Sequence, residues 1–244
     1  MKLDSRFIDW SKGDQMSAIS GDSFFRVDAA TGQVTMSPDI RDALLEALGL
    51  LETYTDLQYV TSNNSYIITD VALDGNYKMT FKGRVVGSGG AAIMTPYTAH
   101  TSATMRQGLL VFNTSSHKIS MYWPNVSWID QSVPDYIDFA SPFVIEQDRY
   151  GVTVTQGGEI WECSYDGSDA MDAAQLYIMG SANPNHTSYK NGEFHELTVE
   201  MHGNVIAHFV PKMRDSDGVA GIYDTVAQKF YVSSGGAFVA GPTK

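Results

Sequence analysis

Apolar and polar residues alternate along most of this chain. The clearest run is Tyr77–Val85, where odd-numbered positions are mostly apolar and even-numbered positions are polar. The same period of two recurs over 118–123, 150–155 and 196–201, and it is the spacing that a half-buried β-strand requires. The pattern therefore predicts a chain built mainly of strands from residue 54 onward.

Short glycine-containing turns separate these runs, at 74–76, 156–158, 166–167 and 202–204. Glycine tolerates the positive φ of a tight turn, and Asp or Asn side chains accept hydrogen bonds from the nearby backbone. Many short strands divided in this way predict an antiparallel β-sandwich. We expect a single sandwich over residues 53–244, and no alternation of strands and helices indicates a doubly wound fold.

Residues 1–52 carry a different pattern. Two short strand-like runs, 23–28 and 33–36, flank a glycine-containing turn and predict a hairpin. Ser37 is then a good N-cap, and apolar residues repeat at helical spacing until Gly49, a natural end. A helix of about three turns cannot bury its apolar stripe alone. We predict that this hairpin-plus-helix segment serves attachment or oligomerisation.

The charge balance limits the classes of ligand that the chain is expected to bind. Sixteen lysines and arginines face 28 acids, so the formal net charge is −12. Such a chain repels phosphate backbones and anionic lipids, which argues against binding to nucleic acid or membranes. No stretch approaches the ~18 apolar residues of a membrane helix, and the first residues lack the apolar run of a secretory signal. We therefore expect synthesis in the cytoplasm without a signal peptide.

Two separated stretches resemble one family. Residues 66–78, YIITDVALDGNYK, resemble the opening of LamG-like jelly-roll domains found in phage and prophage structural proteins. Residues 205–242 are similar to the ending of these domains, "DFVPxxRxSDGVxGxYDxVxxKFYxxxGxGxFxxGP". The resemblance implies a mainly β, concanavalin A-like (LamG) antiparallel β-sandwich jelly roll over residues 53–244. It also implies a phage particle as the setting, and no reaction.

The second stretch has plain structural interpretations as well. We expect Pro211 to end its strand, because proline cannot donate the next ladder hydrogen bond. Asp217 and Gly218 are typical of a turn. Tyr223 and Phe230 are expected to fill the core as large aromatic side chains.

The spacing of the acidic residues gives little support to an enzymatic function. Retaining glycan hydrolysis needs two carboxyl groups about 5 Å apart. The nearest pairs, Glu159 with Glu162 and Asp135 with Asp138, are spaced i, i+3, which places them on opposite faces of a strand. The six histidines lack zinc-binding spacing, and the single cysteine, Cys163, is typical of a small buried hydrophobe. We predict no catalytic residues and no resident cofactor.

Calcium is a candidate ligand, because the resemblance implies a sandwich that often carries one ion at its rim. Asp166 and Asp169 are the expected ligands, with Asp172 nearby and the turn of Asp215 and Asp217 as an alternative. Carboxylate oxygens are the ligands that Ca²⁺ prefers, although acid-rich turns are usually only solvated.

A recognition rim is predicted where aromatic residues gather before a long loop. Its members are Tyr122, Trp123, Asn125 and Trp128. Exposed aromatic rings stack on the apolar faces of sugars, and an amide can hydrogen-bond a hydroxyl. Burial of these rings in the core is the alternative.

These observations predict a non-enzymatic bacteriophage virion protein. A capsid decoration, head fibre or tail fibre would display the LamG-like domain at the virion surface for attachment to host-surface glycans. Residues 1–52 would bind other virion proteins or form a homo-oligomer, with a trimer as the expectation for a fibre. Two alternatives stay open: a glycan-active hydrolase of the same fold, and a bacterial carbohydrate-binding adhesin.

Overall fold

In the computed structural model, the chain divides into two compact units, Met1–Glu52 and Thr53–Lys244. The residues that the structure describes are 25–27, 34–36, 51–62, 64–86, 90–97, 110–113, 117–123, 126–164, 174–179 and 192–244. Only the backbone is described for 25–27, 34–36, 90–97, 110–113, 120–123, 126–129 and 174. Within these ranges, no helix is long and apolar enough to cross a membrane.

The first unit contains two short paired strands. β1 (Phe25–Val27) and β2 (Val34–Met36) run antiparallel, and they fall inside the predicted runs 23–28 and 33–36. The predicted helix from 37 to 49 lies outside the described residues.

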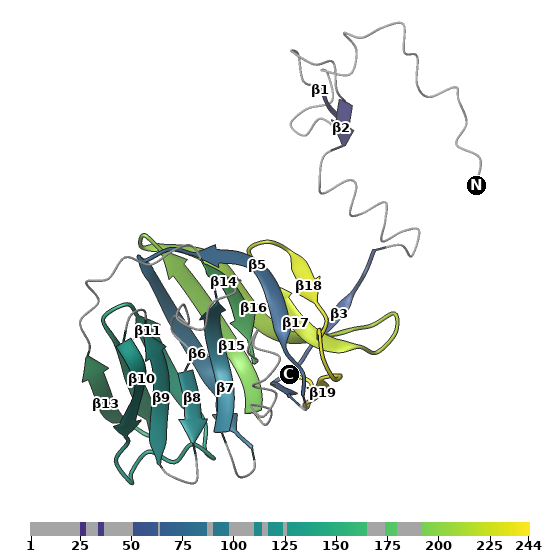
Figure 1. The fold of residues 1–244 in the computed structure, drawn as a ribbon. Coiled ribbons are helices and arrows are strands. Elements are labelled where there is room, and N and C mark those ends of the chain that lie inside the picture. The colour runs from purple at the N-terminus through teal and green to yellow at the C-terminus, as the bar shows by residue number, and fades with distance from the viewer. Residues whose placement is uncertain are drawn as a thin grey trace, which may run out of the picture. The chain divides into compact units, whose positions relative to one another are not determined.

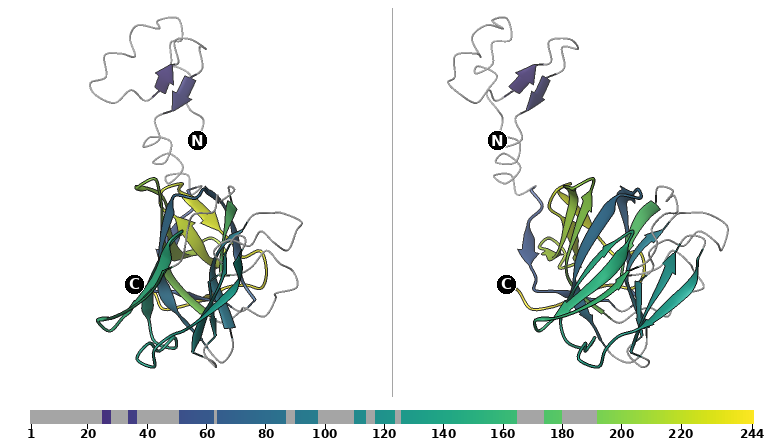
Figure 2. Two further views of the ribbon diagram at one scale, coloured as in Figure 1. Left: turned by 60° about the vertical axis from the view of Figure 1, so that its left-hand side comes forward. Right: turned by 90° about the vertical axis from the view of Figure 1, so that its left-hand side faces the viewer.

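The second unit contains two antiparallel sheets (Figures 1 and 2). The smaller sheet has six strands in the order β10-β9-β8-β7-β14-β5. Its strands are β5 (Ile67–Leu73), β7 (Gly90–Tyr97), β8 (Leu110–Asn113), β9 (Lys118–Trp123), β10 (Val126–Ser132) and β14 (Ala174–Ile178).

The larger sheet has eleven strands, eight of them in the order β13-β12-β11-β6-β15-β16-β17-β18. These are β6 (Tyr77–Val85), β11 (Phe143–Asp148), β12 (Gly151–Gln156), β13 (Glu159–Ser164), β15 (Gly192–Met201), β16 (Asn204–Arg214), β17 (Ala220–Asp224) and β18 (Lys229–Tyr231). Three short strands extend this sheet: β3 (Tyr54–Asp56) pairs with β16, β4 (Val60–Thr61) pairs with β15, and β19 (Val239–Ala240) pairs with β4.

One apolar core lies between the two sheets. Met79 and Phe81 of the larger sheet and Ile67 and Leu176 of the smaller sheet are fully buried in it. Along β6 every odd position is buried and every even position is at least partly exposed, as the alternation predicts. Removal of these apolar side chains from water holds the sheets together. The predicted mainly β antiparallel sandwich is confirmed.

Two hairpin turns, one at each end of β12, connect three neighbouring strands of the larger sheet. Between β11 and β12, the Asp148 carboxylate accepts hydrogen bonds from the backbone nitrogens of Tyr150 (2.7 Å) and Gly151 (3.0 Å), which fixes the turn. Between β12 and β13, Gly157 and Gly158 have φ of 59° and 91°. Positive φ at both central residues of a two-residue loop matches the twist of the flanking strands. The turn predicted at 156–158 is therefore present.

Pro211 does not end its strand, so this prediction is wrong. β16 continues through Pro211 to Arg214. On one side, β16 pairs with β15 up to Phe209 and with β3 from Lys212 onward. Pro211 lies between these two ladders, and its carbonyl accepts a hydrogen bond from Leu57 N at 3.1 Å. The proline ring thus occupies a position where no N–H donor is required.

Tyr223 and Phe230 do not fill the core, which corrects a second prediction. They lie half-buried on the outer face of the larger sheet, where both rings contact Tyr54 at centroid distances of 5.1 and 5.0 Å. Their neighbours Ile222 and Tyr231 are the buried residues. Successive side chains of a strand point to opposite faces of the sheet. If the buried face of a strand is assigned wrongly, every side chain of that strand is therefore placed on the wrong face.

Candidate functional site

The predicted recognition rim falls on the edge of the smaller sheet. Tyr122 and Trp123 lie in β9, Trp128 lies in β10, and Trp123 is opposite Val126 across the two strands. Asn125 lies outside the described residues, as do the side chains of the other three. The rim therefore stays a prediction.

The predicted calcium ligands also lie outside the described residues, since Asp166, Asp169 and Asp172 all do. The alternative turn is described, and both of its acids have protein partners. Asp215 accepts a hydrogen bond from Thr55 Oγ1 at 2.7 Å, and Asp217 forms an ion pair with Arg214 at 2.6 Å. Among the residues with described side chains, no three His, Cys, Asp or Glu residues gather as metal ligands would.

A polar groove crosses the outer face of the larger sheet at the β11–β12 turn. It consists of two adjoining hollows of about 290 and 160 Å³ that share Lys78, Asp148 and Tyr150. We call it the Tyr150 groove. Beyond the shared three, the residues that line it and bear on its chemistry are Asn76, Tyr77, Glu146, Arg149, Thr153, Glu162, Ser164 and Glu200.

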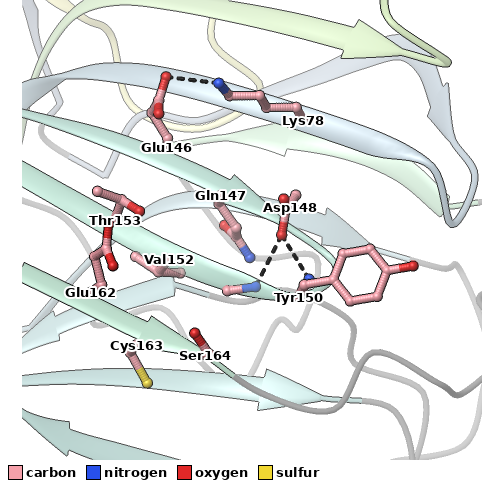
Figure 3. A pocket seen from close by; sticks show the side chains of 11 residues that line it. Lys78, Glu146, Gln147, Asp148, Tyr150, Val152, Thr153, Glu162, Cys163 and Ser164 are labelled. Carbon is pink, nitrogen blue, oxygen red and sulfur yellow. Dashed lines mark hydrogen bonds and ion pairs between the residues drawn. The ribbon is translucent and has the colours of Figure 1, made fainter.

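The strand register brings the acids of the groove onto one face. Thr153 of β12 lies opposite Glu146 of β11 and opposite Glu162 of β13. Adjacent strands are about 4.8 Å apart, so the backbones of the two glutamates are about 10 Å apart. Figure 3 shows these side chains on neighbouring strands of the larger hollow. This pair was missed because it arises from cross-strand pairing and not from local spacing.

Lys78 supplies the main counter-charge in the groove. Its Nζ lies 2.9 Å from Glu146 Oε1. The hydrogen bond to Glu146 raises the pKa of Lys78, and partial burial opposes this effect.

Tyr150 is the exposed aromatic residue of the groove. Its side chain sits on the turn that Asp148 fixes, and it is 59% exposed. The Arg149 guanidinium carbon lies 5.3 Å from the ring centroid, a cation–π distance. In Figure 3 the ring projects away from the other labelled side chains. The groove thus combines charged hydrogen-bonding groups with one solvent-facing ring.

The acid pairs considered from the sequence do not form the groove. The Asp138 carboxylate accepts hydrogen bonds from Ser141 Oγ (2.8 Å) and Ala140 N (2.9 Å), which lower the pKa of Asp138 and give it a structural role. Glu162 lines the groove, and Glu159, which is spaced i, i+3 from it, does not. Cys163 packs against the core, and burial raises the pKa of its thiol, which disfavours the nucleophilic thiolate.

A second hollow of about 310 Å³ lies near the other end of β6 and includes His195. Behind it, buried Glu193 accepts two hydrogen bonds from Arg84, at 2.5 and 2.6 Å. Burial raises the pKa of Glu193, but the hydrogen bonds and charge of Arg84, with a smaller effect of His195, outweigh it and hold the pKa below its ordinary value of 4.5. These contacts join β6 to β15 and give the group a structural role.

No protein-family model and no curated protein matches this chain. Solved structures do match by fold. Galectin-Ib of Xenopus laevis is 8% identical, and the match covers 58% of this chain and 99% of the galectin at a TM-score of 0.34. A SAP-like pentraxin from Limulus polyphemus is 10% identical over 61% and 74% of the two chains, at a TM-score of 0.38. The family 7 alginate lyase A1-II′, solved in complex with substrate, is 12% identical over 75% and 83%, at a TM-score of 0.34. Likenesses this weak carry no argument about ligand or reaction.

Proposed function

We propose that this protein is a non-enzymatic carbohydrate-binding protein that holds glycans in the Tyr150 groove. One observation carries the proposal: an exposed aromatic ring stands beside a polar groove lined from several strands of a sheet. A sugar presents an apolar ring face for stacking and hydroxyl groups for hydrogen bonds. The groove offers a partner for each of these.

The setting of this activity is the surface of a bacteriophage particle. The support is the sequence resemblance of 66–78 and 205–242 to LamG-like domains of phage structural proteins. Residues 1–52 dock onto other virion proteins or form a homotrimer, and many copies on one particle turn weak glycan binding into firm attachment.

A hydrolase is the second candidate, because Glu146 and Glu162 line one hollow with backbones about 10 Å apart. Inverting glycosidases place their carboxyl groups roughly 6.5–9.5 Å apart. Lys78 argues against this role, since its Nζ lies 2.9 Å from Glu146 Oε1 and holds this carboxyl group in an ion pair, away from a glycosidic oxygen. We expect no new reducing ends when glycans are incubated with the protein. Reducing ends that disappear in Glu146→Gln would establish the hydrolase instead.

The groove itself is tested with a blocking substitution. Thr153 lies on the groove floor, so Thr153→Arg fills the space between Glu146 and Glu162. On a glycan array, we expect this variant to lose the signals of the unmodified protein. The matched control is Thr155→Arg, two residues along β12 and outside the groove. Equal signals for Thr153→Arg and the unmodified protein would refute the site.

The attachment role of the first unit needs a separate test. A chain lacking residues 1–52 retains the unit Thr53–Lys244. We expect it to bind glycans normally and to be absent from purified particles, as measured by immunoblot. Full incorporation of the truncated chain would assign docking to the sandwich.

A further inference from the structure

Two turns that are far apart in the sequence lie side by side at the smaller hollow of the Tyr150 groove. Residues 74–76 join β5 to β6, and residues 202–203 join β15 to β16. β6 and β15 are paired up to the residues directly beside these turns, and the His202 backbone nitrogen donates to the Asn76 carbonyl oxygen at 2.9 Å. Asn76 and Gly203 both line the hollow, so the two turns together form one of its walls.

The His202 side chain connects the two turns through two further hydrogen bonds. Its Nε2 lies 2.7 Å from Asp74 Oδ2, and its Nδ1 lies 3.1 Å from Asn76 Nδ2. The Asp74 carboxylate also accepts a hydrogen bond from the Asn76 backbone nitrogen at 2.8 Å. This backbone hydrogen bond and the one from His202 lower the pKa of Asp74, so the carboxylate is ionised at neutral pH.

These contacts determine which nitrogen of the His202 ring carries the proton. An ionised carboxylate only accepts hydrogen bonds, so Nε2 must donate to Asp74. In the neutral ring Nδ1 is then an acceptor, and the Asn76 amide nitrogen donates to it. The other end of this amide, Oδ1, has no donor among the described residues. It is therefore the end that Asn76 offers to a ligand in the hollow.

Protonation of His202 reverses this hydrogen-bonding pattern. A charged imidazole donates from both nitrogens and accepts at neither. Nδ1 then requires an acceptor, which the Asn76 amide supplies by a half-turn about its last side-chain bond. Oδ1 turns to the ring, and the amide nitrogen, a donor, becomes the end offered to a ligand. The His202 side chain is 59% exposed, so protons from solvent reach it directly.

The other charged groups near the ring keep their charge while a histidine titrates. Among the described residues, those that face the ring or the hollow beside it are Asp74, Lys78, Asp148, Arg149 and Glu200. Imidazole side chains ordinarily change charge between about pH 5 and 8, whereas carboxylates do so below this range and Lys and Arg above it. A change of binding within this range is therefore assigned to a histidine.

We propose that His202 is a positioning residue of the Tyr150 groove that acts through Asn76. It makes the groove select glycans with a free hydroxyl at this position over O-methylated or O-acetylated glycans at neutral pH, and protonation removes the selection. The inference rests on the proposed function, because it concerns the ligand of the same groove.

The selection follows from the end of the amide that meets the ligand. A free hydroxyl donates to Asn76 Oδ1, whereas an ether or ester oxygen can only accept and meets Oδ1 as a second acceptor. An acceptor left without a hydrogen bond in this way corresponds to about tenfold in affinity. When His202 is protonated, the Asn76 amide nitrogen donates to hydroxyl, ether and ester oxygens alike.

The first experiment is nitrogen-15 NMR of the full chain between about pH 8 and pH 5. In the basic range we expect His202 to carry its proton on Nε2 and none on Nδ1. On acidification, the resonances of the Asn76 side-chain amide should shift with the same midpoint as the His202 ring. His202→Gln should remove this shift. The matched control is His208→Gln, which removes another carboxylate-bonded ring of the same sheet and should leave it unchanged.

The second experiment is a glycan array that carries each glycan with free hydroxyls and in O-methylated and O-acetylated form. At about pH 8 the free form should bind about tenfold more tightly than its substituted forms, and at about pH 5.5 the difference should fall to within about twofold. His202→Gln should give the same ratio at both pH values, whereas His208→Gln should change as the unmodified protein does.

Several outcomes would overturn the inference and leave the proposed function standing. They are a proton on Nδ1 of His202 in the basic range, Asn76 resonances that do not follow the ring, and a binding ratio that is the same at both pH values. A pH-dependent ratio that persists in His202→Gln would overturn it as well, because another group would then set the preference. Absence of glycan signals at both pH values would overturn both the inference and the proposed function.

Discussion

Replacement of Tyr150 by alanine tests the stacking surface directly. A tyrosine side chain presents about 200 Å², and this one is 59% exposed, so about 120 Å² faces solvent. Arg149 lies over the ring at 5.3 Å from its centroid, and a sugar stacked on one face of the ring would cover about half of the exposed area, about 60 Å². At about 25 cal/mol/Å² this area contributes about 1.5 kcal/mol, and Tyr150→Ala should raise Kd about 12-fold.

The assay is calorimetric titration with a glycan identified on the array. Tyr150→Phe keeps the ring, so its Kd should stay within about twofold of the original value. Tyr136→Ala is the matched control, because Tyr136 is also 50% exposed and lies outside the groove. The stacking argument fails if Tyr150→Ala binds as well as the unmodified protein, or if Tyr136→Ala loses as much affinity.

Three further predictions concern stability, each measured by urea denaturation. Asp224 is buried, and its carboxylate accepts hydrogen bonds from the backbone nitrogens of His208, Val226 and Ala227. Asp224→Ala should therefore lower the free energy of unfolding by about 3 kcal/mol. A change below about 1 kcal/mol would contradict this role of the carboxylate. Gly83→Ala would place a Cβ atom 2.3 Å from the Glu193 carbonyl oxygen, so it should lower the free energy of unfolding by about 1–3 kcal/mol. An unchanged unfolding midpoint would show instead that β6 and β15 can move apart to accept the methyl group. Because the pKa of Glu193 is lower in the folded chain than its ordinary 4.5, its contribution is present above that pH and is lost as the pH falls further. Glu193→Gln should remove this part of the acid dependence, and an identical pH profile would argue against it.

Local pattern predicted the strands well but not their partners. The alternation along β6 and the turn at 156–158 are local signals, and both are present in the structure. Tyr223 and Phe230 were assigned to the wrong face, because size alone does not tell which face of a strand is buried. The buried carboxylate of Asp224 belongs to the same face as Ile222, which hydrophobicity would not suggest.

The Tyr150 groove lay beyond sequence reasoning for a related reason. Glu146 and Glu162 come from β11 and β13, which are neighbours only through β12. An Asp shortly before a Gly, as in Asp148 to Gly151, is a local signal for a turn, but no turn was assigned here from the sequence. Glu146 and Glu162 lie on the same face only because of the register of the strands. A period of two residues within each strand does not determine that register.

The way in which β3 joins β16 has a mechanical consequence. β3 lies antiparallel to β16, an ion pair joins Asp56 to Lys212 at 3.2 Å, and Leu57 pairs with Thr243 near the C-terminus. Thr53 directly precedes β3, so tension arriving along the backbone there reaches β16 through this ladder and this ion pair. The same corner also secures the last residues of the chain, because Thr243 pairs with Leu57 directly after β3.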